Sequence, residues 1–349
     1  MEMDTVCSSA PGFQLRRDVP LVQCNTFQVA ARASLLADVW DSAALPHLLR
    51  LPEVQNQPLI VLGGGSNILF TRDYCGLIVH LTTRGIEIVE PHPEWSLVRV
   101  AAGEEWDGFV RWSLRHGFTG LENLVLIPGS VGAAPIQNIG AYGVEVSEFV
   151  CGVVGWDRCA ARFVHLSHED CAFGYRHSLF KRHPERYIVT AVDFRLPRNR
   201  PLHLDYAGIR QELAAMAVTS AAADDVARAV ENIRRRKLPD PALVGNAGSF
   251  FKNPVVTVRQ MQALRIDNPD MPVYPHSEDC CKLSAAWLIE ACGFRGMREG
   301  DAGVSEKHAL VLVNHGEASG AQIWALAQKI RHAVNLRFGV SLEPEPLVL

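Results

Sequence analysis

The loop-like stretch at residues 124–143 constrains the fold more than any other part of this sequence. Residues 128–143 read PGSVGAAPIQNIGAYG, and neither the helical period nor the strand period runs through them. A segment of this length without regular periodicity is more often functional than a simple connection. Val131, Ile136 and Ile139 are residues of the kind that become buried, which argues against a plain surface loop. We therefore expect its small residues to let the backbone pass close to a large planar or phosphorylated ligand.

A second glycine-rich segment, residues 63–67 (GGGSN), follows the apolar run at 59–62. The pattern predicts a strand, a tight turn and a second strand at 68–70. Consecutive glycines let several backbone amides approach one phosphate, although a plain glycine turn would have the same sequence. The segment is not a Rossmann fingerprint, because the third glycine of that pattern would fall at Ile68 and no long helix begins there.

Four further segments carry polar groups that are unremarkable singly. Residues 245–254 place Ser249 in a tight turn, where a serine is usually a turn former. The basic run at 234–237 ends a predicted helix, so a solvated face is its default interpretation. Residues 173–176 (FGYR) and 342–345 (LEPE) add an arginine and two carboxylates. Together these segments supply an arginine, a serine and two candidate carboxylates, Glu343 and Glu345.

Composition indicates an ordinary folded protein. The chain has 349 residues, enough for two or three domains, with 48% hydrophobic and 21% charged residues. Its 34 Lys and Arg against 38 Asp and Glu exclude the basic excess of a typical nucleic-acid binder, so an anion site must be local. No apolar run reaches the roughly 18 residues that cross a bilayer, and the start at 1–4 is acidic where a signal peptide is basic. We expect a soluble cytoplasmic protein that binds neither nucleic acid nor membrane.

The nine cysteines are odd in number and form no Cys-x-x-Cys pair. We therefore expect reduced, mostly buried thiols, without a disulfide framework or a metal site.

Hydrophobic spacing predicts the main elements. Leu35, Leu36, Val39 and Trp40 have helical spacing, which predicts a helix before strand 59–62 in a small α/β unit. Residues 85–200 are rich in strands (86–89, 97–101, 150–156, 162–166 and 187–196) around one helix at 104–116 that ends at Gly117. A second helix at 224–237 is ended by the prolines of 238–241, which indicates a domain boundary. Helices at 282–292 and 321–338 then flank a strand at 309–313.

Six motifs occur in the order found in the UDP-N-acetylenolpyruvoylglucosamine reductase family, and the resemblance covers essentially the whole chain. They are residues 63–67, 128–143, 173–176, 237–241, 245–254 and 342–345. The resemblance implies an α+β protein: an FAD-binding fold of the p-cresol methylhydroxylase/vanillyl-alcohol oxidase type with an additional C-terminal α+β substrate domain. The implied parts are FAD-binding subdomains at 1–82 and 83–237 and a substrate domain at 238–339, with 340–349 returning near the active site.

The resemblance also implies an activity. Members of this family reduce the enolpyruvyl ether of a UDP-sugar with NADPH, through bound FAD, in peptidoglycan precursor synthesis. Neither 63–67 nor 129–143 contains a histidine or cysteine, the residues that generally carry a covalent flavin in this fold, so we expect FAD to be non-covalent. We also expect a cytoplasmic monomer.

Motif positions imply roles for individual residues. Arg176 would hold the enolpyruvyl carboxylate, Ser249 would protonate the carbanion, and Glu345, favoured over Glu343 by spacing, would orient the enolic carboxyl group. Flavin contacts are implied at Gly63, Gly64, Gly65, Ser66, Asn67, Pro128, Gly129, Ser130, Gly132, Gln137, Asn138, Gly140, Ala141, Tyr142 and Gly143. Substrate contacts are implied at Tyr175, Tyr206, Lys237, Asn253, Tyr274 and Arg295, with Lys237 at the diphosphate and Tyr274 on a loop that closes over substrate.

The sequence departs from the family pattern at a few positions. Ala133 and Ala134 stand where hydroxyl residues are common, Arg295 replaces a lysine, and Pro346 stands where a β-branched residue is usual. Because proline lacks an amide donor, we expect the chain to pair poorly after Glu345. Two other functions use part of the same features: another flavoenzyme of this fold, such as an alcohol or sugar oxidase, and a nucleotide-sugar-binding protein without catalysis.

Overall fold

The structure is a computed structural model that describes residues 5–349, so the acidic start at 1–4 lies outside the described residues. Residue contacts group the chain into two units. Unit 1 contains residues up to 19 together with 32–65 and 74–235, and unit 2 contains 20–31, 66–73 and 236–349. The three-part division at 82 and 237 remains a prediction. No helix within 5–349 combines the length and the apolarity needed to cross a bilayer.

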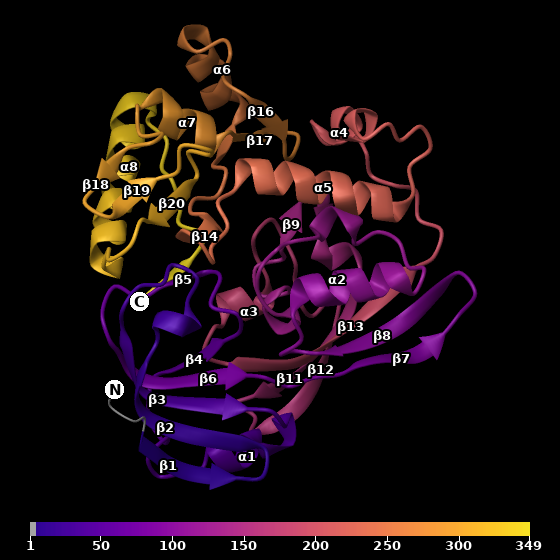
Figure 1. Cartoon of the computed structure of the whole chain (residues 1–349), viewed down its shortest axis with the longest axis vertical. Coiled ribbons are helices and arrows are strands. Elements are labelled where there is room, and N and C mark those ends of the chain that lie inside the picture. The colour runs from indigo at the N-terminus through magenta and orange to yellow at the C-terminus, as the bar shows by residue number, and fades with distance from the viewer. Residues whose placement is uncertain (1–4) are drawn as a thin grey trace. The chain divides into compact units, whose positions relative to one another are not determined.

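The first sheet of unit 1 has the strand order β1-β2-β3-β6-β4 (Figure 1). Its strands are β1 (Thr5–Ala10), β2 (Phe13–Pro20), β3 (Arg32–Val39), β4 (Leu59–Leu62) and β6 (Tyr74–Leu81). Strands β3, β6 and β4 are parallel, whereas β1 and β2 form an antiparallel hairpin. The short helix α1 (Leu45–Leu48) contributes Leu45 and Leu48 to the core over this sheet.

The second sheet of unit 1 is antiparallel, with the order β12-β11-β13-β8-β7. Its strands are β7 (Ile86–Pro91), β8 (Trp95–Ala101), β11 (Val150–Asp157), β12 (Arg162–Ser167) and β13 (Tyr187–Pro197), as predicted within a few residues. Helix α2 (Trp106–Arg115) and helix α5 (Ala223–Lys237) bury their apolar faces in one core with this sheet (Figure 1). The remaining elements of unit 1 are β9 (Gly140–Ala141), β10 (Val144–Glu145), α3 (Leu179–Arg182) and α4 (Ile209–Ala215).

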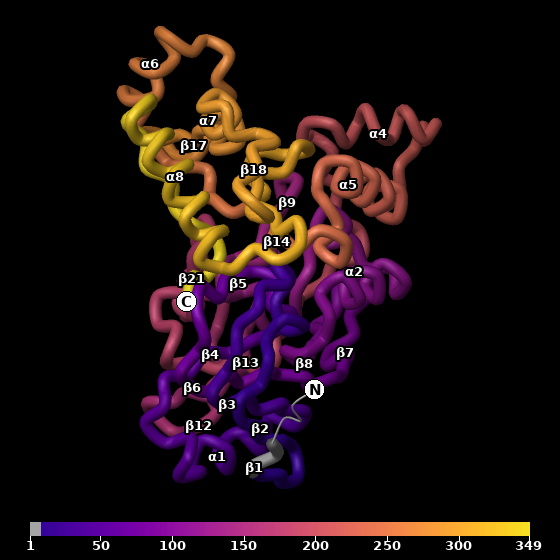
Figure 2. Tube along the Cα trace, turned by 60° about the vertical axis from the view of Figure 1, so that its left-hand side comes forward, coloured from indigo at the N-terminus to yellow at the C-terminus, as the bar shows by residue number. Residues whose placement is uncertain are grey.

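Unit 2 contains three small sheets and three helices. One sheet has the order β14-β20-β19-β18, from β14 (Gly245–Ser249), β18 (Arg298–Glu299), β19 (Ala302–Val304) and β20 (Val311–Asn314). A second has the order β15-β17-β16, from β15 (Val255–Thr257), β16 (Val273–Pro275) and β17 (Cys280–Leu283). The helices are α6 (Val258–Asp267), α7 (Ala285–Ala291) and α8 (Gly320–Phe338). Near the end of the chain, β21 (Leu347–Val348) lies beside β5 (Ile68–Leu69), as Figure 2 shows.

One predicted helix was wrong, and the predicted start of another was wrong. Residues 35–40 belong mainly to strand β3, not to a helix. A strand inside a parallel sheet buries both faces, so Leu35, Leu36 and Val39 are all buried without alternation, and the spacing resembled that of a helix. The helix predicted at 282–292 begins only at Ala285, because Lys282 and Leu283 extend strand β17 and the Ser284 side chain caps the helix.

The prediction for Pro346 was also wrong. Leu347 N–H donates to the Asn67 carbonyl at 3.0 Å, and Leu349 N–H donates to the Leu69 carbonyl at 3.0 Å. A strand directs alternate amides toward one neighbour, so the pairing uses residues 347 and 349 and does not need an amide at 346.

The cysteines from Cys24 to Cys292 are all free thiols, as predicted. The expectation that they are mostly buried was wrong, because only Cys171 and Cys281 are buried while Cys75 and Cys159 are exposed.

Candidate active site

In unit 1 the two predicted glycine-rich segments meet. A Cβ added at Gly63 would lie 2.1 Å from Ser130 Oγ, and one added at Gly64 would lie 3.0 Å from the Gly129 Cα. Side chains cannot approach that closely, so the contact depends on glycine at both positions. Gly129 itself has a positive φ of 120°, which a residue with a Cβ rarely adopts.

Backbone hydrogen bonds fix the 128–143 segment at the start of α2. Trp106 N–H donates to the Gly129 carbonyl at 3.0 Å, Val131 N–H to Glu104 at 2.8 Å and Gly132 N–H to Ala102 at 2.9 Å. A Cβ at Gly132 would come within 2.5 Å of the Ala102 Cβ, so this part of the segment also packs too closely for a side chain. Val131 is fully buried and lies in the core as expected.

The second half of the segment is organised by Asn138, whose backbone is left-handed at a φ of 48°. Its buried amide donates to Glu145 Oε2 at 2.8 Å and to the Gly174 carbonyl at 3.1 Å, and its oxygen accepts from Ser147 N–H at 3.0 Å. The Asn138 side chain therefore joins the segment to the turn that carries Arg176. Its predicted role as a flavin contact remains a prediction.

Arg176 occupies that turn with a left-handed φ of 51°. Its Nη2 donates to the Gly140 carbonyl at 2.7 Å and its Nη1 to the Asn138 carbonyl at 3.4 Å, while the guanidinium lies 5.4 Å from the centre of the Tyr175 ring. The structure thus brings a fixed positive charge directly against the predicted flavin segment. In the same unit, the ring of Tyr206 contacts that of Tyr142, with centres 5.1 Å apart.

Donors without protein acceptors occur in the same region of unit 1. The amides of Gly64 and Gly129 donate to no described residue, as expected of a turn that binds a phosphate. Arg234 Nε is buried and has no acceptor among the described residues, and burial lowers the pKa of Arg234, partly offset by Tyr142 and Asp107. These unpaired donors fit an anionic cofactor such as FAD.

Arg234 is a residue that the sequence interpretation missed, because the run at 234–237 was read as a solvated face. Arg235, Arg236 and Lys237 are exposed, but Arg234 lies four residues after the buried Val230 and is largely covered. Helical spacing from Val230 was the signal that could have distinguished it.

In unit 2, Ser249 ends strand β14, which pairs with β20 so that Ser249 faces Val311. The preceding Gly248 has a positive φ of 67° and donates its amide to Asn246 Oδ1 at 2.9 Å, which shapes the turn. Phe250 N–H then donates to the Leu310 carbonyl at 2.7 Å. The Ser249 hydroxyl is therefore presented from a rigid backbone.

The C-terminal segment passes next to this turn. Glu345 N–H donates to the Phe250 carbonyl at 2.8 Å, and the Asn67 side chain donates to the Glu345 carbonyl at 3.3 Å. The structure thus places the backbone of Glu345 next to Phe250, the residue after Ser249, and next to Asn67 at the end of the predicted 63–67 segment. Glu343, the competing candidate, instead forms an ion pair with Lys252, with Nζ 2.6 Å from Oε1, which is consistent with Glu345 as the predicted catalytic carboxylate.

The predicted substrate residues of unit 2 occupy several elements. Asn253 Oδ1 accepts from Ala285 N–H at 3.0 Å, so its oxygen holds the start of α7. Tyr274 lies on strand β16 with 40% of its surface exposed, so it is not a core aromatic, as predicted. Arg295 pairs with Glu290 at 2.8 Å and donates from Nε to the Glu306 carbonyl at 2.7 Å. Lys237 is exposed, and its ammonium has no partner among the described residues.

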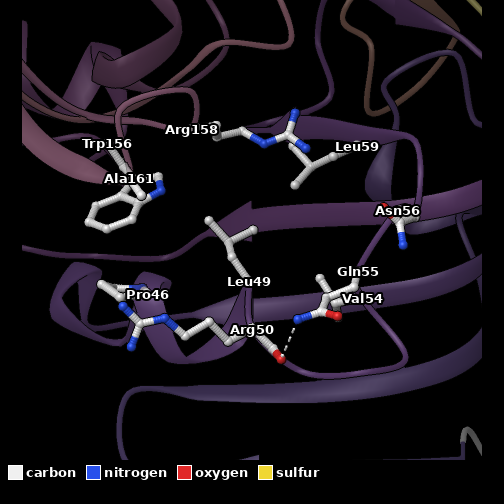
Figure 3. Close-up of a pocket in the computed structure, with 10 residues that line it drawn as sticks. All are labelled: Pro46, Leu49, Arg50, Val54, Gln55, Asn56, Leu59, Trp156, Arg158 and Ala161. Carbon is white, nitrogen blue, oxygen red and sulfur yellow. Dashed lines mark hydrogen bonds between the residues drawn. The ribbon is translucent and has the colours of Figure 1, made fainter.

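A cavity of about 310 Å³ in unit 1 lies apart from these residues (Figure 3). Arg50 and Arg158 lie on opposite sides of it, and its lining comprises Pro46, Leu49, Arg50, Val54, Gln55, Asn56, Leu59, Trp156, Arg158 and Ala161. None of the predicted site residues belongs to this lining, so the cavity is not the predicted flavin site.

Comparison with known proteins tests the resemblance directly. The family model for the C-terminal domain of UDP-N-acetylenolpyruvoylglucosamine reductase matches residues 240–349, and that for an FAD binding domain matches 34–159. The UDP-N-acetylenolpyruvoylglucosamine reductase of Xanthomonas euvesicatoria pv. vesicatoria is 53% identical over 97% of both chains. The chain belongs to the UDP-N-acetylenolpyruvoylglucosamine reductase family. The predicted family membership is confirmed.

Two further comparisons agree with this assignment. The UDP-N-acetylenolpyruvoylglucosamine reductase of Xanthomonas oryzae pv. oryzae is also 53% identical over 97% of both chains. The structure of UDP-N-acetylenolpyruvylglucosamine reductase from Thermus caldophilus has a TM-score of 0.67, with 23% identity, covering 96% of this chain and 99% of that one. The predicted α+β fold, with an FAD-binding part followed by the family's C-terminal domain, is thus confirmed, as is the assignment to flavin-dependent oxidoreductases.

Proposed function

We propose that this chain uses NADPH and non-covalently bound FAD to reduce the enolpyruvyl ether of UDP-N-acetylenolpyruvoylglucosamine to UDP-N-acetylmuramate. The observation that carries the proposal is identity of 53% over 97% of the chain to reductases of that name, together with the backbone of Glu345 held next to Phe250, the residue after Ser249. The reaction belongs to peptidoglycan precursor synthesis, which takes place in the cytoplasm, and we propose that the enzyme acts there as a monomer.

The flavin would be held by the glycine-rich backbone of unit 1. The amides of Gly64 and Gly129 suit its diphosphate, and Arg234 offers a buried positive charge. When bound, FAD would supply hydride transfer between NADPH and the terminal enolpyruvyl carbon.

Arg176 would stabilise the negative charge that then develops on the enolpyruvyl carboxylate. Its guanidinium is already fixed by the Asn138 and Gly140 carbonyls, so little reorganisation is needed when the charge appears. Tyr175, stacked against this guanidinium, would border the same subsite.

Ser249 would donate a proton to the carbon that bears the carboxylate, and Glu345 would orient the carboxyl group. Transfer of one hydride and one proton saturates the enolic double bond and leaves the UDP-sugar otherwise intact. Lys237 and Arg295 would bind the diphosphate, Asn253 would contribute its free amide donors, Tyr206 would border the sugar nucleotide, and Tyr274 would close over it.

Isotope labelling tests this function. Turnover in D₂O with NADPH should place one deuterium on the carbon next to the carboxylate, and turnover with NADPH deuterated at the transferred position should place one on the terminal carbon. One NADPH should be consumed for each UDP-N-acetylmuramate formed. NADPH consumption coupled to oxygen, without a labelled product, would favour an oxidase of the same fold. A colourless protein that binds no FAD would favour a nucleotide-sugar-binding protein.

Acid precipitation tests the mode of flavin attachment. We expect all yellow colour in the supernatant. Colour that stays with the precipitated protein would contradict non-covalent binding.

A further inference from the structure

The turn between β19 and β20 lies directly beside the backbone of Ser249. Ser305 N–H donates to the Val311 carbonyl at 2.8 Å, and Val311 N–H donates to the His308 carbonyl at 3.0 Å, which closes the turn. Phe250 N–H donates to the carbonyl of Leu310 in the same turn at 2.7 Å. A side chain carried by this turn is therefore held at a fixed position near the predicted active site of unit 2.

His308 is the titratable residue of that turn whose ring is fixed. Leu310 N–H donates to its Nδ1 at 3.3 Å. Because Nδ1 accepts this bond, the neutral ring carries its proton on Nε2. Nε2 makes no hydrogen bond with the described residues, and the side chain is only partly buried, so a ligand can reach this donor.

The charges around His308 are those expected of a diphosphate site. Burial lowers the pKa of His308, the positive charges of Lys237 and Arg295 lower it further, and Glu290 acts in the opposite direction. The pKa of His308 therefore lies below its ordinary 6.5, and Arg295 is held at the same turn because its Nε donates to the Glu306 carbonyl at 2.7 Å. Lys237 has no partner among residues 5–349, and Nη2 of Arg295 likewise has none, so both cations retain donors for a ligand.

We propose that Nε2–H of His308 donates a hydrogen bond to a diphosphate oxygen of the UDP-sugar, between Lys237 and Arg295. The inference rests on the proposed function and adds to it a substrate-binding residue that none of the six sequence motifs contains. A neutral donor fits this position because two cations already supply the positive charge, and a further charge would be repelled in the free enzyme. A purely structural role of His308 would require only Nδ1, which accepts the hydrogen bond from the Leu310 amide.

Two substitutions separate these roles because each keeps one end of the imidazole. His308→Asn places an amide oxygen near the position of Nδ1 but has no donor at the position of Nε2. His308→Gln places an amide donor near the position of Nε2 and loses the acceptor for Leu310. The holoenzyme and both variants would be titrated with UDP-N-acetylglucosamine, which carries the diphosphate but no enolpyruvyl group, by calorimetry at fixed pH and ionic strength.

We expect His308→Asn to raise the dissociation constant about tenfold or more, and His308→Gln to stay within about threefold of the unmodified enzyme. Equal affinity of His308→Asn and the unmodified enzyme would overturn the inference. Equal weakening by both variants would also overturn it, because a structural role of the turn would then suffice. If His308→Asn does not fold, nuclear magnetic resonance of the unmodified enzyme with ¹⁵N-labelled histidine decides, since an Nε2 signal that does not move on titration contradicts the inference.

Lys237→Ala distinguishes failure of this inference from failure of the proposed function. If Lys237→Ala weakens binding and His308→Asn does not, only the role of His308 is wrong. If the unmodified enzyme does not bind UDP-N-acetylglucosamine at all, the proposed diphosphate site is wrong and the role of His308 fails with it.

Discussion

Replacement of Ser249 by alanine should slow only one half of the catalytic cycle. The structural cost of the change is small, because the Ser249 hydroxyl makes no hydrogen bond with the described residues and the side chain is partly exposed. The backbone pairing with Val311 does not involve the side chain. We therefore expect a loss of at most about 1 kcal/mol in the free energy of unfolding.

The catalytic cost should be much larger. Loss of a general acid typically slows a proton transfer by about 10²–10⁴-fold, which corresponds to roughly 3–5 kcal/mol of activation free energy. In the proposed mechanism, Ser249 would donate its proton only in the half-reaction with the enolpyruvyl substrate. Flavin reduction by NADPH should therefore remain nearly unchanged, whereas reoxidation by the enolpyruvyl substrate should slow by that factor.

Stopped-flow absorbance under anaerobic conditions measures the two half-reactions separately. Ser319→Ala is a suitable control, because Ser319 caps α8 and its loss should cost about 1 kcal/mol of stability without changing either half-reaction. Equal slowing of both half-reactions by Ser249→Ala would refute its assignment as proton donor. An unchanged reoxidation rate would do the same.

Three other changes test separate parts of the account. Gly132→Ala brings a Cβ within 2.5 Å of the Ala102 Cβ, so FAD retention measured by absorbance should fall about tenfold, whereas Gly108→Ala in helix α2, whose Cβ would have no neighbour closer than 3.8 Å, should retain FAD. Lys237→Ala should raise the Michaelis constants for NADPH and the UDP-sugar more than it lowers kcat, and this effect should be smaller at high salt. Unchanged Michaelis constants would indicate that Lys237 is only a solvated surface residue. Asp193 is buried against Arg99 at 2.7 Å; burial raises its pKa, but hydrogen bonds from Arg99 and His165 outweigh this and lower the pKa below its ordinary 3.8. The ionised Asp193 therefore stabilises the folded state at pH values above the pKa of an aspartate in the unfolded chain, and this stabilisation is lost as the pH falls through the lower pKa of the folded state. Asparagine at this position cannot ionise, so the free energy of unfolding of Asp193→Asn, measured in urea, should depend less on pH below about 4 than that of the unmodified enzyme.

Local sequence patterns were sufficient to predict a helix or strand when only one of its faces is buried. Helices α2 and α5 follow from the spacing of residues such as Phe109 and Val230, because a surface helix must separate apolar from polar positions. Strand β3 could not be recognised in this way, since both of its faces are covered by partners distant in sequence. The strand pairing after Pro346 likewise depends on β5, which lies nearly 280 residues earlier in the chain. The local effect of a proline does not reveal such a distant partner.

The candidate site shows the same limit. Sequence motifs predicted Ser249 and Glu345 as site residues, but the approach of their backbones depends on the contact between Phe250 and the C-terminal segment. Arg234 and His308 were missed because their importance arises from what surrounds them: a buried Nε without an acceptor in one case, and two nearby cations in the other. Sequence patterns of basic residues cannot distinguish such positions from a solvated face without the helical phase and the tertiary neighbours.

In the proposed catalytic cycle, NADPH reduces the bound flavin and an enolpyruvyl UDP-sugar reoxidises it. Double-mixing stopped-flow tests this most directly: the yellow enzyme is first bleached anaerobically with one equivalent of NADPH and then mixed with UDP-N-acetylenolpyruvoylglucosamine. We expect the flavin absorbance to return rapidly with this substrate and to stay bleached with UDP-N-acetylglucosamine, which lacks the enolpyruvyl group. Flavin that stays reduced in the presence of the enolpyruvyl substrate, but is reoxidised when oxygen is admitted, would contradict the account.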